Sequence, residues 1–410
     1  MSRPLRDTEL SGLARGIVTA ETTQRLNAAQ LAKHQILVET VRRRAARTQS
    51  ASTVATLTRA VELLTEIQSQ DPHVVDELLA LPQIGSWAVS CLEGMRRGER
   101  PDADYLAQLA AGAAFRVGRE CGPPADRNGH TFFPGLGVRD GTRWTLIPHL
   151  RVRAGELALS VNLDAMDPYL GMYGRRTRPN PREWRDRLTV AWRILVHRHR
   201  SSARVLAVGV RTLVPLAGPT SGPPFSGTSG WTYGAVATSL PDDSLILAET
   251  LIHEFQHLTL GAVEDLVALT QAYDKRLWYA PWREDPRPLS ALLQGCYAFL
   301  GVTEFWREER NAGPPEDRRR AEAAFARWRR ATFDAARTLS AADGLTATGR
   351  AFATGIRERL EPWMTEPVSP AAERYAARAG AEHRARWEHA HGDGHANSRV
   401  GRISRASARG

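Results

Sequence analysis

The sequence is poor in cysteine and lysine and has no long apolar run, and each shortage excludes a class of protein. Three cysteines among 410 residues are too few and too scattered for a disulfide framework or a cysteine-based zinc site. No stretch of about 18 uninterrupted apolar residues is present, so we expect no membrane-spanning helix. The first residues lead into no apolar signal core, and we therefore expect a cytoplasmic protein.

The positive charge of the chain comes almost entirely from arginine. Basic residues outnumber acidic ones by 55 to 45, and only Lys33 and Lys275 are lysines. This preference is typical of a GC-rich genome. Arginines cluster over 175–204 and 318–330, but aromatic residues do not alternate with them, and no nucleic-acid-binding signature is present. We therefore interpret these clusters as solvated surface and do not expect a nucleic acid or a membrane as a partner.

Helices, then a sheet, then helices follow one another along the chain, which predicts an α+β fold. Apolar residues recur at helical spacing over 25–117, and alternating or β-branched residues predict strands over 144–147, 156–163, 203–213 and 233–240. We expect five regions: N-terminal helices (1–121), a strand-rich part (122–243), metal-site helices with a proline-rich loop (244–312), C-terminal helices (313–370) and a basic, disordered tail (371–410).

The segment that carries the clearest chemistry is His253-Glu254-x-x-His257. Residues four apart lie one turn apart on one face of a helix, so both imidazoles can bind one divalent metal while Glu254 stands beside it. A capping segment, 241–244, precedes the motif, and apolar residues form a stripe opposite the histidines. The sequence thus predicts a zincin-like metal-binding helix that follows a strand.

A third metal ligand is not evident from the spacing. Glu264 lies about 10 Å further along a continuous helix and could reach the ion only if Gly261 ended that helix. In the next predicted helix, a stripe of small residues is bordered by Gln294, which could therefore face the metal directly or through water. Glu304, further along the same helix, is the carboxylate alternative. An ordinary buried hydrogen-bonding role for Gln294 is an equal alternative.

Two arginines lie in the proline-rich loop 279–288, between the two helices. Its three prolines restrict the backbone, and a rigid guanidinium is well suited to hold a carboxylate through two hydrogen bonds. Arg287, or else Arg283, is therefore a candidate carboxylate clamp. The alternative is that both arginines pair with Glu284 and Asp285.

Several segments together resemble a bacterial family of H-E-x-x-H peptide-modification proteins: Leu251–Leu258, Tyr279–Pro288, Leu292–Ala298 and Leu81–Trp87. Members are encoded with radical-SAM maturases and short precursor peptides of ribosomally made natural products. The family is understood as 2-oxoglutarate- and iron-dependent peptide β-hydroxylases. Many relatives have a histidine at the position of Gln294, and this chain departs from the pattern there.

Two enzyme classes follow from these observations. In the first, His253, His257 and a ligand at or near Gln294 hold Fe(II), Arg287 or Arg283 binds 2-oxoglutarate, and Glu254 orients a histidine or a water molecule. In the second, a zinc peptidase, Glu254 is the general base. In both classes we expect the strand 233–240 to pair with an extended peptide, through Tyr233, Ala235 and Ala237. The resemblance favours the hydroxylase, with a precursor peptide as substrate and a radical-SAM maturase as a further partner. A non-enzymatic module that binds such a maturase is the third possibility.

Overall fold

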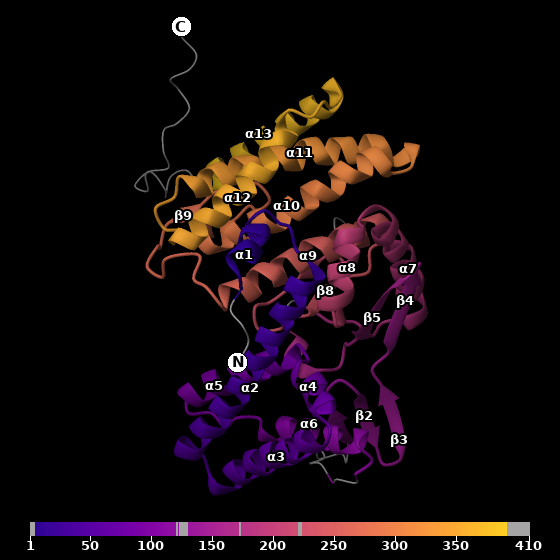
Figure 1. Ribbon diagram of the computed structural model, residues 1–410, viewed down its shortest axis with the longest axis vertical. Helices are drawn as coiled ribbons and strands as arrows, with labels where there is room; N and C mark the ends of the chain where they lie inside the picture. Colours follow the sequence, from indigo (N-terminus) through magenta and orange to yellow (C-terminus); the bar gives the residue numbers. More distant parts are fainter. Residues whose placement is uncertain (1–4, 120–121, 123–129, 172–173, 220–223, 392–410) are drawn as a thin grey trace. The chain divides into compact units, whose positions relative to one another are not determined.

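The structure is a computed structural model that describes residues 5–119, 122, 130–171, 174–219 and 224–391, and its fold class is α+β (Figure 1). The chain divides into two compact units. The first unit contains residues 18–266, and the second contains residues 6–17 together with the chain from residue 267 onward. None of the helices in the described part is both long and apolar enough to span a membrane.

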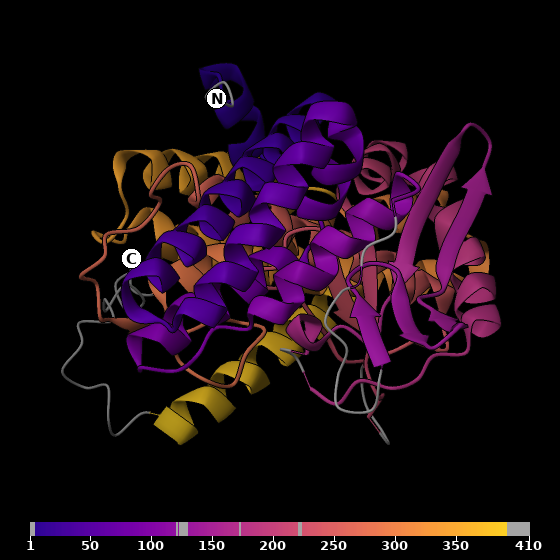
Figure 2. The same cartoon turned by 90° about the horizontal axis from the view of Figure 1, so that it is seen from below.

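The first unit begins with the helices that the periodicity predicts. They are α2 (Ala20–Thr48), α3 (Ala51–Gln70), α4 (Pro72–Leu79), α5 (Gln83–Arg96) and α6 (Ala103–Arg116). Leu57, Leu64 and Ile67 are buried at helical spacing on α3, and Trp87 of α5 lies fully buried in the same core. The helices lie side by side in both views (Figures 1 and 2), because each buries one apolar face against its neighbours.

Two sheets follow in the first unit. β1 (His130–Phe133), β2 (Gly137–Asp140) and β3 (Arg143–Leu146) form a small antiparallel sheet in sequence order. The larger sheet has the order β4-β5-β6-β8-β7, with β4 (His149–Ala154), β5 (Leu157–Leu163), β6 (Thr212–Pro215), β7 (Ser226–Gly227) and β8 (Ala235–Thr238). β6 is parallel to both neighbours, and β7 is antiparallel to β8. The remaining helices of this unit are α7 (Pro181–Arg198), α8 (Arg200–Gly209) and α9 (Ser244–Glu264), with the 3₁₀ turn η1 (Pro168–Leu170).

The predicted strand over 203–213 is wrong for most of its length. Residues 200–209 form α8, and only Thr212–Pro215 is a strand. Ala203, Leu206 and Gly209 are buried at a spacing of three residues, which is helical. A Cβ at Gly209 would lie 2.3 Å from the ring of Phe255 on α9. Close packing against α9 therefore outweighs the β-branched composition of this segment.

The second unit is built from α10 (Leu289–Ala312), α11 (Pro315–Ser340), α12 (Ala347–Met364) and α13 (Pro370–His391). A two-stranded hairpin, β9 (Leu277–Trp278) with β10 (Arg287–Pro288), closes the proline-rich loop ahead of α10. The short helix α1 (Asp7–Ala14) packs on α12, because Gly355 leaves room for the backbone of Ala14. α1 thus belongs to this unit and not to the N-terminal helical region in which the sequence placed it.

The disordered tail predicted to start at residue 371 starts too early in the sequence. Residues 370–391 form α13, which buries Ala372, Ala376, His383 and Trp387 along one face. The His383 ring lies 2.8 Å from the Tyr279 hydroxyl, and the Trp387 ring contacts the same tyrosine edge-on. These tertiary contacts order a segment that is poor in large apolar residues. The remainder of the predicted tail, residues 392–410, lies outside the described residues.

Candidate functional site

α9 carries the H-E-x-x-H motif, and its ends are those that local capping dictates. The Asp243 side chain accepts a hydrogen bond from the Leu245 backbone N–H at 2.8 Å, which caps the first turn. β8 precedes the helix, as predicted. The helix runs without a break through Gly261 to Glu264. Glu264 therefore lies two turns beyond the histidines and is not brought back towards them.

His253 and His257 lie together on one face of α9. Their Nε2 atoms are 3.2 Å apart, and the rings meet edge-on with their centroids 4.8 Å apart. Burial and the neighbouring His257 lower the pKa of His253 well below its ordinary value. The imidazole is therefore neutral at physiological pH, which is the form that binds a metal ion.

The distance between the two Nε2 atoms fits a shared metal ion. Metal–nitrogen bonds are about 2.0–2.1 Å long, so two nitrogens on one ion lie about 3.0 Å apart at 90° and about 3.4 Å apart at a tetrahedral angle. The observed 3.2 Å lies between these values. The same distance also suits an N–H···N hydrogen bond between two neutral rings, so the pair is stable without a metal as well.

Glu254 is buried beside the histidines, with 2% of its surface exposed. Its Oε1 accepts a hydrogen bond from the Ser226 hydroxyl at 2.7 Å, and its Oε2 is buried without a hydrogen-bond partner among the described residues. Burial raises the pKa of Glu254, while the His257 ring and hydrogen bonds from the Ser226 and Thr228 side chains oppose the rise. Side chains on and next to β7 thus hold the carboxylate in place on α9.

The predicted peptide-binding strand needs correction. β8 pairs with β6 along its whole length, and Ala237 and Thr238 pair with β7 on the other side. Tyr233, Ala235 and Ala237 are all at least 95% buried. Because Ala237 already has a neighbouring strand on each side, it cannot pair with a further strand. The alternating run of small residues here is that of a central strand.

β7 is the outermost strand on this side of the sheet among the described residues, and sequence reasoning missed it. It follows Phe225, whose side chain is 54% exposed, and leads to Trp231, which is 43% exposed. The Lys33 ammonium lies 4.7 Å from the centre of the Trp231 ring and pairs with Asp265 at 2.7 Å. Two exposed aromatic residues in a Gly/Ser-rich loop were the available signal.

The proposed third ligand lies in the second unit. Gln294 is half-buried on α10, and the alternative, Glu304, forms an ion pair with Arg359 at 2.5 Å. The small-residue stripe on α10 makes room for an aromatic side chain of the loop, because a Cβ at Gly295 would lie 2.5 Å from Trp282. The role of Gln294 as a metal ligand stays a prediction.

Both arginines of the loop bind the same carboxylate. Arg283 donates to one oxygen of Asp285 at 2.8 Å, and Arg287 donates to the other at 2.9 Å. Although partial burial acts against it, these bonds lower the pKa of Asp285 to about 2. The predicted pairing within the loop, which was the alternative to a carboxylate clamp, is therefore observed for Asp285. Each guanidinium has five N–H donors, so a second carboxylate can still bind.

Comparisons with known proteins add no assignment. Within the part of the chain that the structure describes, no group of three or more His, Cys, Asp or Glu side chains is arranged to hold a metal ion. No model of a known protein family matches the chain, and no curated protein sequence matches it significantly. The family resemblance therefore stays a prediction from the motifs.

Proposed function

We propose that this chain is an Fe(II)- and 2-oxoglutarate-dependent hydroxylase that acts on a ribosomally made precursor peptide. The proposed reaction converts a side-chain β-C–H bond of the peptide, 2-oxoglutarate and O₂ into the alcohol, succinate and CO₂. The observation that carries the proposal is the 3.2 Å separation of the His253 and His257 Nε2 atoms beside a buried carboxylate. A radical-SAM maturase that acts on the same peptide is the proposed partner.

Each residue of the site has a proposed task. His253 and His257 hold the metal ion through Nε2, with Gln294 as the third protein ligand. When bound, the iron and 2-oxoglutarate supply the oxidant for an unactivated C–H bond. Arg287, or else Arg283, binds the distal carboxylate of 2-oxoglutarate. That carboxylate accepts some of the hydrogen bonds that the arginine otherwise donates to Asp285.

Glu254 has a positioning task in this proposal. Its bond to Ser226 ties β7 to α9, so the outermost strand of the sheet lies against the helix that carries the two histidines. An extended peptide that adds to β7 would pass along this face of α9, between the exposed Phe225 and Trp231. This strand replaces β8 as the proposed docking edge.

A zinc peptidase is the second candidate, and one observation favours it. The Glu254 carboxylate follows His253 directly in the motif and is held in place by the hydrogen bond from Ser226 at 2.7 Å, as a general base that takes a proton from metal-bound water would have to be. Zinc supplies the Lewis acidity in that case. Glu254 therefore separates the two candidates.

The first experiment measures metal content. Purified chain is reconstituted with Fe(II) under anaerobic conditions, and bound iron is determined by elemental analysis. We expect the His253→Ala and His257→Ala variants to lose the iron, whereas His73→Ala, at an exposed position of α4, retains it. Equal iron in the wild type and both site variants would refute the metal site.

The second experiment measures the reaction. The precursor peptide encoded beside this gene is incubated with Fe(II), ascorbate, 2-oxoglutarate and air, and analysed by mass spectrometry. We expect addition of one oxygen atom with equimolar succinate, and appreciable turnover in Glu254→Gln, which keeps the shape and the bond from Ser226. Peptide cleavage with Zn(II) alone, reduced about 10²–10⁴-fold in Glu254→Gln, would instead identify a peptidase.

A further inference from the structure

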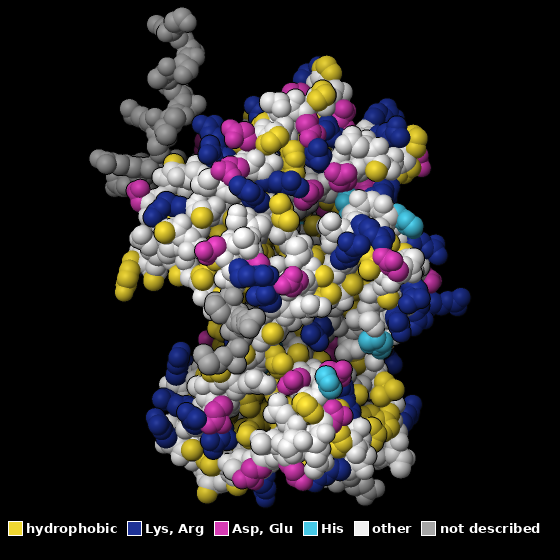
Figure 3. Space-filling model, in the orientation of Figure 1, with side chains coloured by type: hydrophobic (Ala, Val, Ile, Leu, Met, Phe, Trp, Pro, Cys, Tyr) yellow, Lys and Arg dark blue, Asp and Glu magenta, His cyan; other side chains and the backbone are white. Residues whose placement is uncertain are grey.

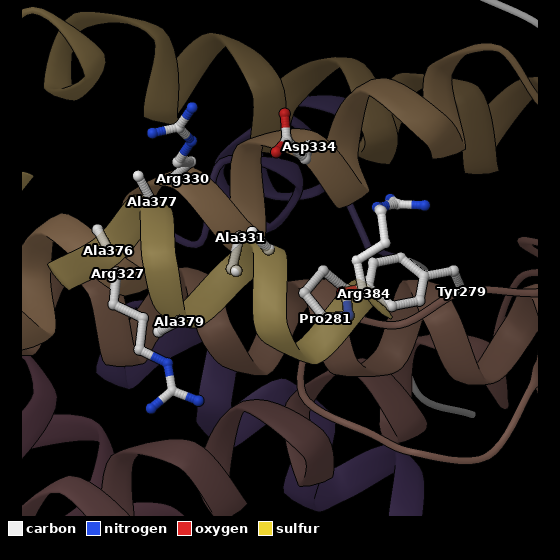
Figure 4. A pocket seen from close by; sticks show the side chains of 12 residues that line it. Tyr279, Pro281, Arg327, Arg330, Ala331, Asp334, Ala376, Ala377, Ala379 and Arg384 are labelled. Carbon is white, nitrogen blue, oxygen red and sulfur yellow. The ribbon is translucent and has the colours of Figure 1, made fainter. Parts of the chain in front are cut away.

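A groove lies between α11 and α13 in the second unit, with alanines as its floor and arginines around its rim (Figure 4). Its volume is about 260 Å³. Ala331 lies in the middle, with Arg327 and Arg330 on one side and Arg384 on the other (Figure 4). Tyr279 and Pro281 of the proline-rich loop close the end beside Arg384.

The small side chains of the two helices create the groove. Ala372 and Ala376 of α13 pack on Ala326 of α11 and bring the helices close together. Beyond this contact, Ala331 and Ala379 line a channel that no large side chain fills. The floor is therefore apolar and shallow, and it accepts small apolar groups but not a bulky ring.

Three arginines and one acidic residue, Asp334, line the groove, and the Asp334 carboxyl interacts with Arg330 and Arg384, so the lining as a whole is positively charged. Arg330 lies 3.5 Å from Glu373, Arg384 lies 3.7 Å from Glu388, and Arg327 covers the ring of Trp328. These long contacts leave most of the five N–H donors of each guanidinium for another acceptor. On the face drawn in Figure 3, basic side chains of this unit are otherwise interspersed with acidic ones.

Three further features indicate what the groove binds. Its volume matches a few side chains of an extended segment and not a folded domain. The Arg384 guanidinium covers one face of the Tyr279 ring at 4.0 Å, so that face is not available for stacking on a nucleotide base. The chain's own last residues, 392–410, contain four arginines and one aspartate and would be repelled from the rim.

We propose that the groove binds an extended acidic segment of a separate polypeptide. Its Asp or Glu carboxylates would accept hydrogen bonds from Arg327, Arg330 and Arg384, and its small apolar side chains would lie on the alanine floor. Arginine suits this task because its planar guanidinium can hold a carboxylate through two parallel bonds. The proposal does not depend on the metal site, and it is tested without iron.

The test measures binding of a fluorescein-labelled octapeptide of alternating Glu and Ala to the full-length chain by anisotropy. We expect the peptide to bind, and we expect its counterpart with Gln in place of Glu to bind at least about tenfold more weakly, because it offers no charged acceptor. The Arg330→Gln/Arg384→Gln double variant should lose at least about fivefold in affinity. Ala377→Leu, which fills the groove without a change of charge, should weaken binding as well.

The matched control is Arg378→Gln. Arg378 lies on α13, its side chain is 81% exposed, and it is not part of the groove lining. The Arg378→Gln substitution removes one positive charge from α13 and should leave the affinity for the peptide unchanged. Circular dichroism should show that every variant is folded. Equal losses in Arg378→Gln and the groove variants, or no binding of the Glu/Ala peptide, would overturn the proposal. Binding of a labelled thymidine octanucleotide that is stronger than that of the peptide, and that the groove variants also lose, would overturn the proposal too. Such a result would indicate a nucleic-acid surface.

Discussion

Replacement of Gly295 by alanine tests how the proline-rich loop is seated on α10. An ideal Cβ at this position would lie 2.5 Å from the Trp282 Nε1 atom and 2.6 Å from two ring carbons. Ordinary contacts between such atoms are about 3.5–4.0 Å, so the indole must move back by about 1 Å. It cannot yield as a flexible chain end would, because it is a rigid ring stacked on Phe299 with 4.7 Å between the ring centres.

The expected cost follows from this clash. Overpacking of a filled site costs about 1–3 kcal/mol of unfolding free energy. A glycine-to-alanine change inside a helix also contributes about 0.8–1 kcal/mol of stability, which partly masks that cost. Gly380→Ala on α13 is the matched control, because it makes the same helical change with nothing within 4 Å of the new Cβ. The difference between the two variants therefore isolates the cost of the clash.

The assay is differential scanning calorimetry of the full-length variants. A difference of 1–3 kcal/mol corresponds to a gap in Tm of about 2–12 °C for a unit of this size. Trp282→Phe in the Gly295→Ala background should recover part of the loss, because the smaller ring leaves room for the methyl group. Equal Tm values for Gly295→Ala and Gly380→Ala, or no recovery with Trp282→Phe, would refute this account of the loop.

The remaining predictions concern the metal, the co-substrate and pH. Iron at 100 times its Kd should raise the unfolding free energy of the wild type by about 2.7 kcal/mol, and urea denaturation should show no such rise in His257→Ala. Arg287→Ala should raise the 2-oxoglutarate concentration needed for half-maximal succinate formation, while the iron content is unchanged. Loss of the folded state would instead show that Arg287 stabilises the loop through Asp285. Burial, with the neighbouring Asp164, raises the pKa of Asp167 to about 7, so the folded chain binds more protons than the unfolded chain between about pH 4 and 7. Stability should therefore fall as pH rises through this window, by up to about 1.4 kcal/mol per pH unit, and Asp167→Asn should flatten that dependence in urea titrations at several pH values.

Local patterns in the sequence determined the helices of the first unit, including the helix that carries the H-E-x-x-H motif. Apolar spacing over 25–117 predicts the helices α2 to α6, and Asp243 marks the first turn of α9. The convergence of His253 and His257 also follows from their separation by one helical turn, because backbone geometry alone fixes it. The pairing of Asp285 with arginines two residues away is local in the same sense and was among the alternatives.

Contacts between distant residues decided the rest. Residues 200–209 are helical because Gly209 receives Phe255, and residues 370–391 are ordered because Tyr279 contacts both His383 and Trp387. The bond between Ser226 and Glu254 joins residues 28 apart, and it ties the outermost strand, β7, to the helix that carries the histidines. A periodic pattern reports only which face of an element is apolar. Which partner covers that face, and which strand ends the sheet, depends on packing that only the folded chain assembles.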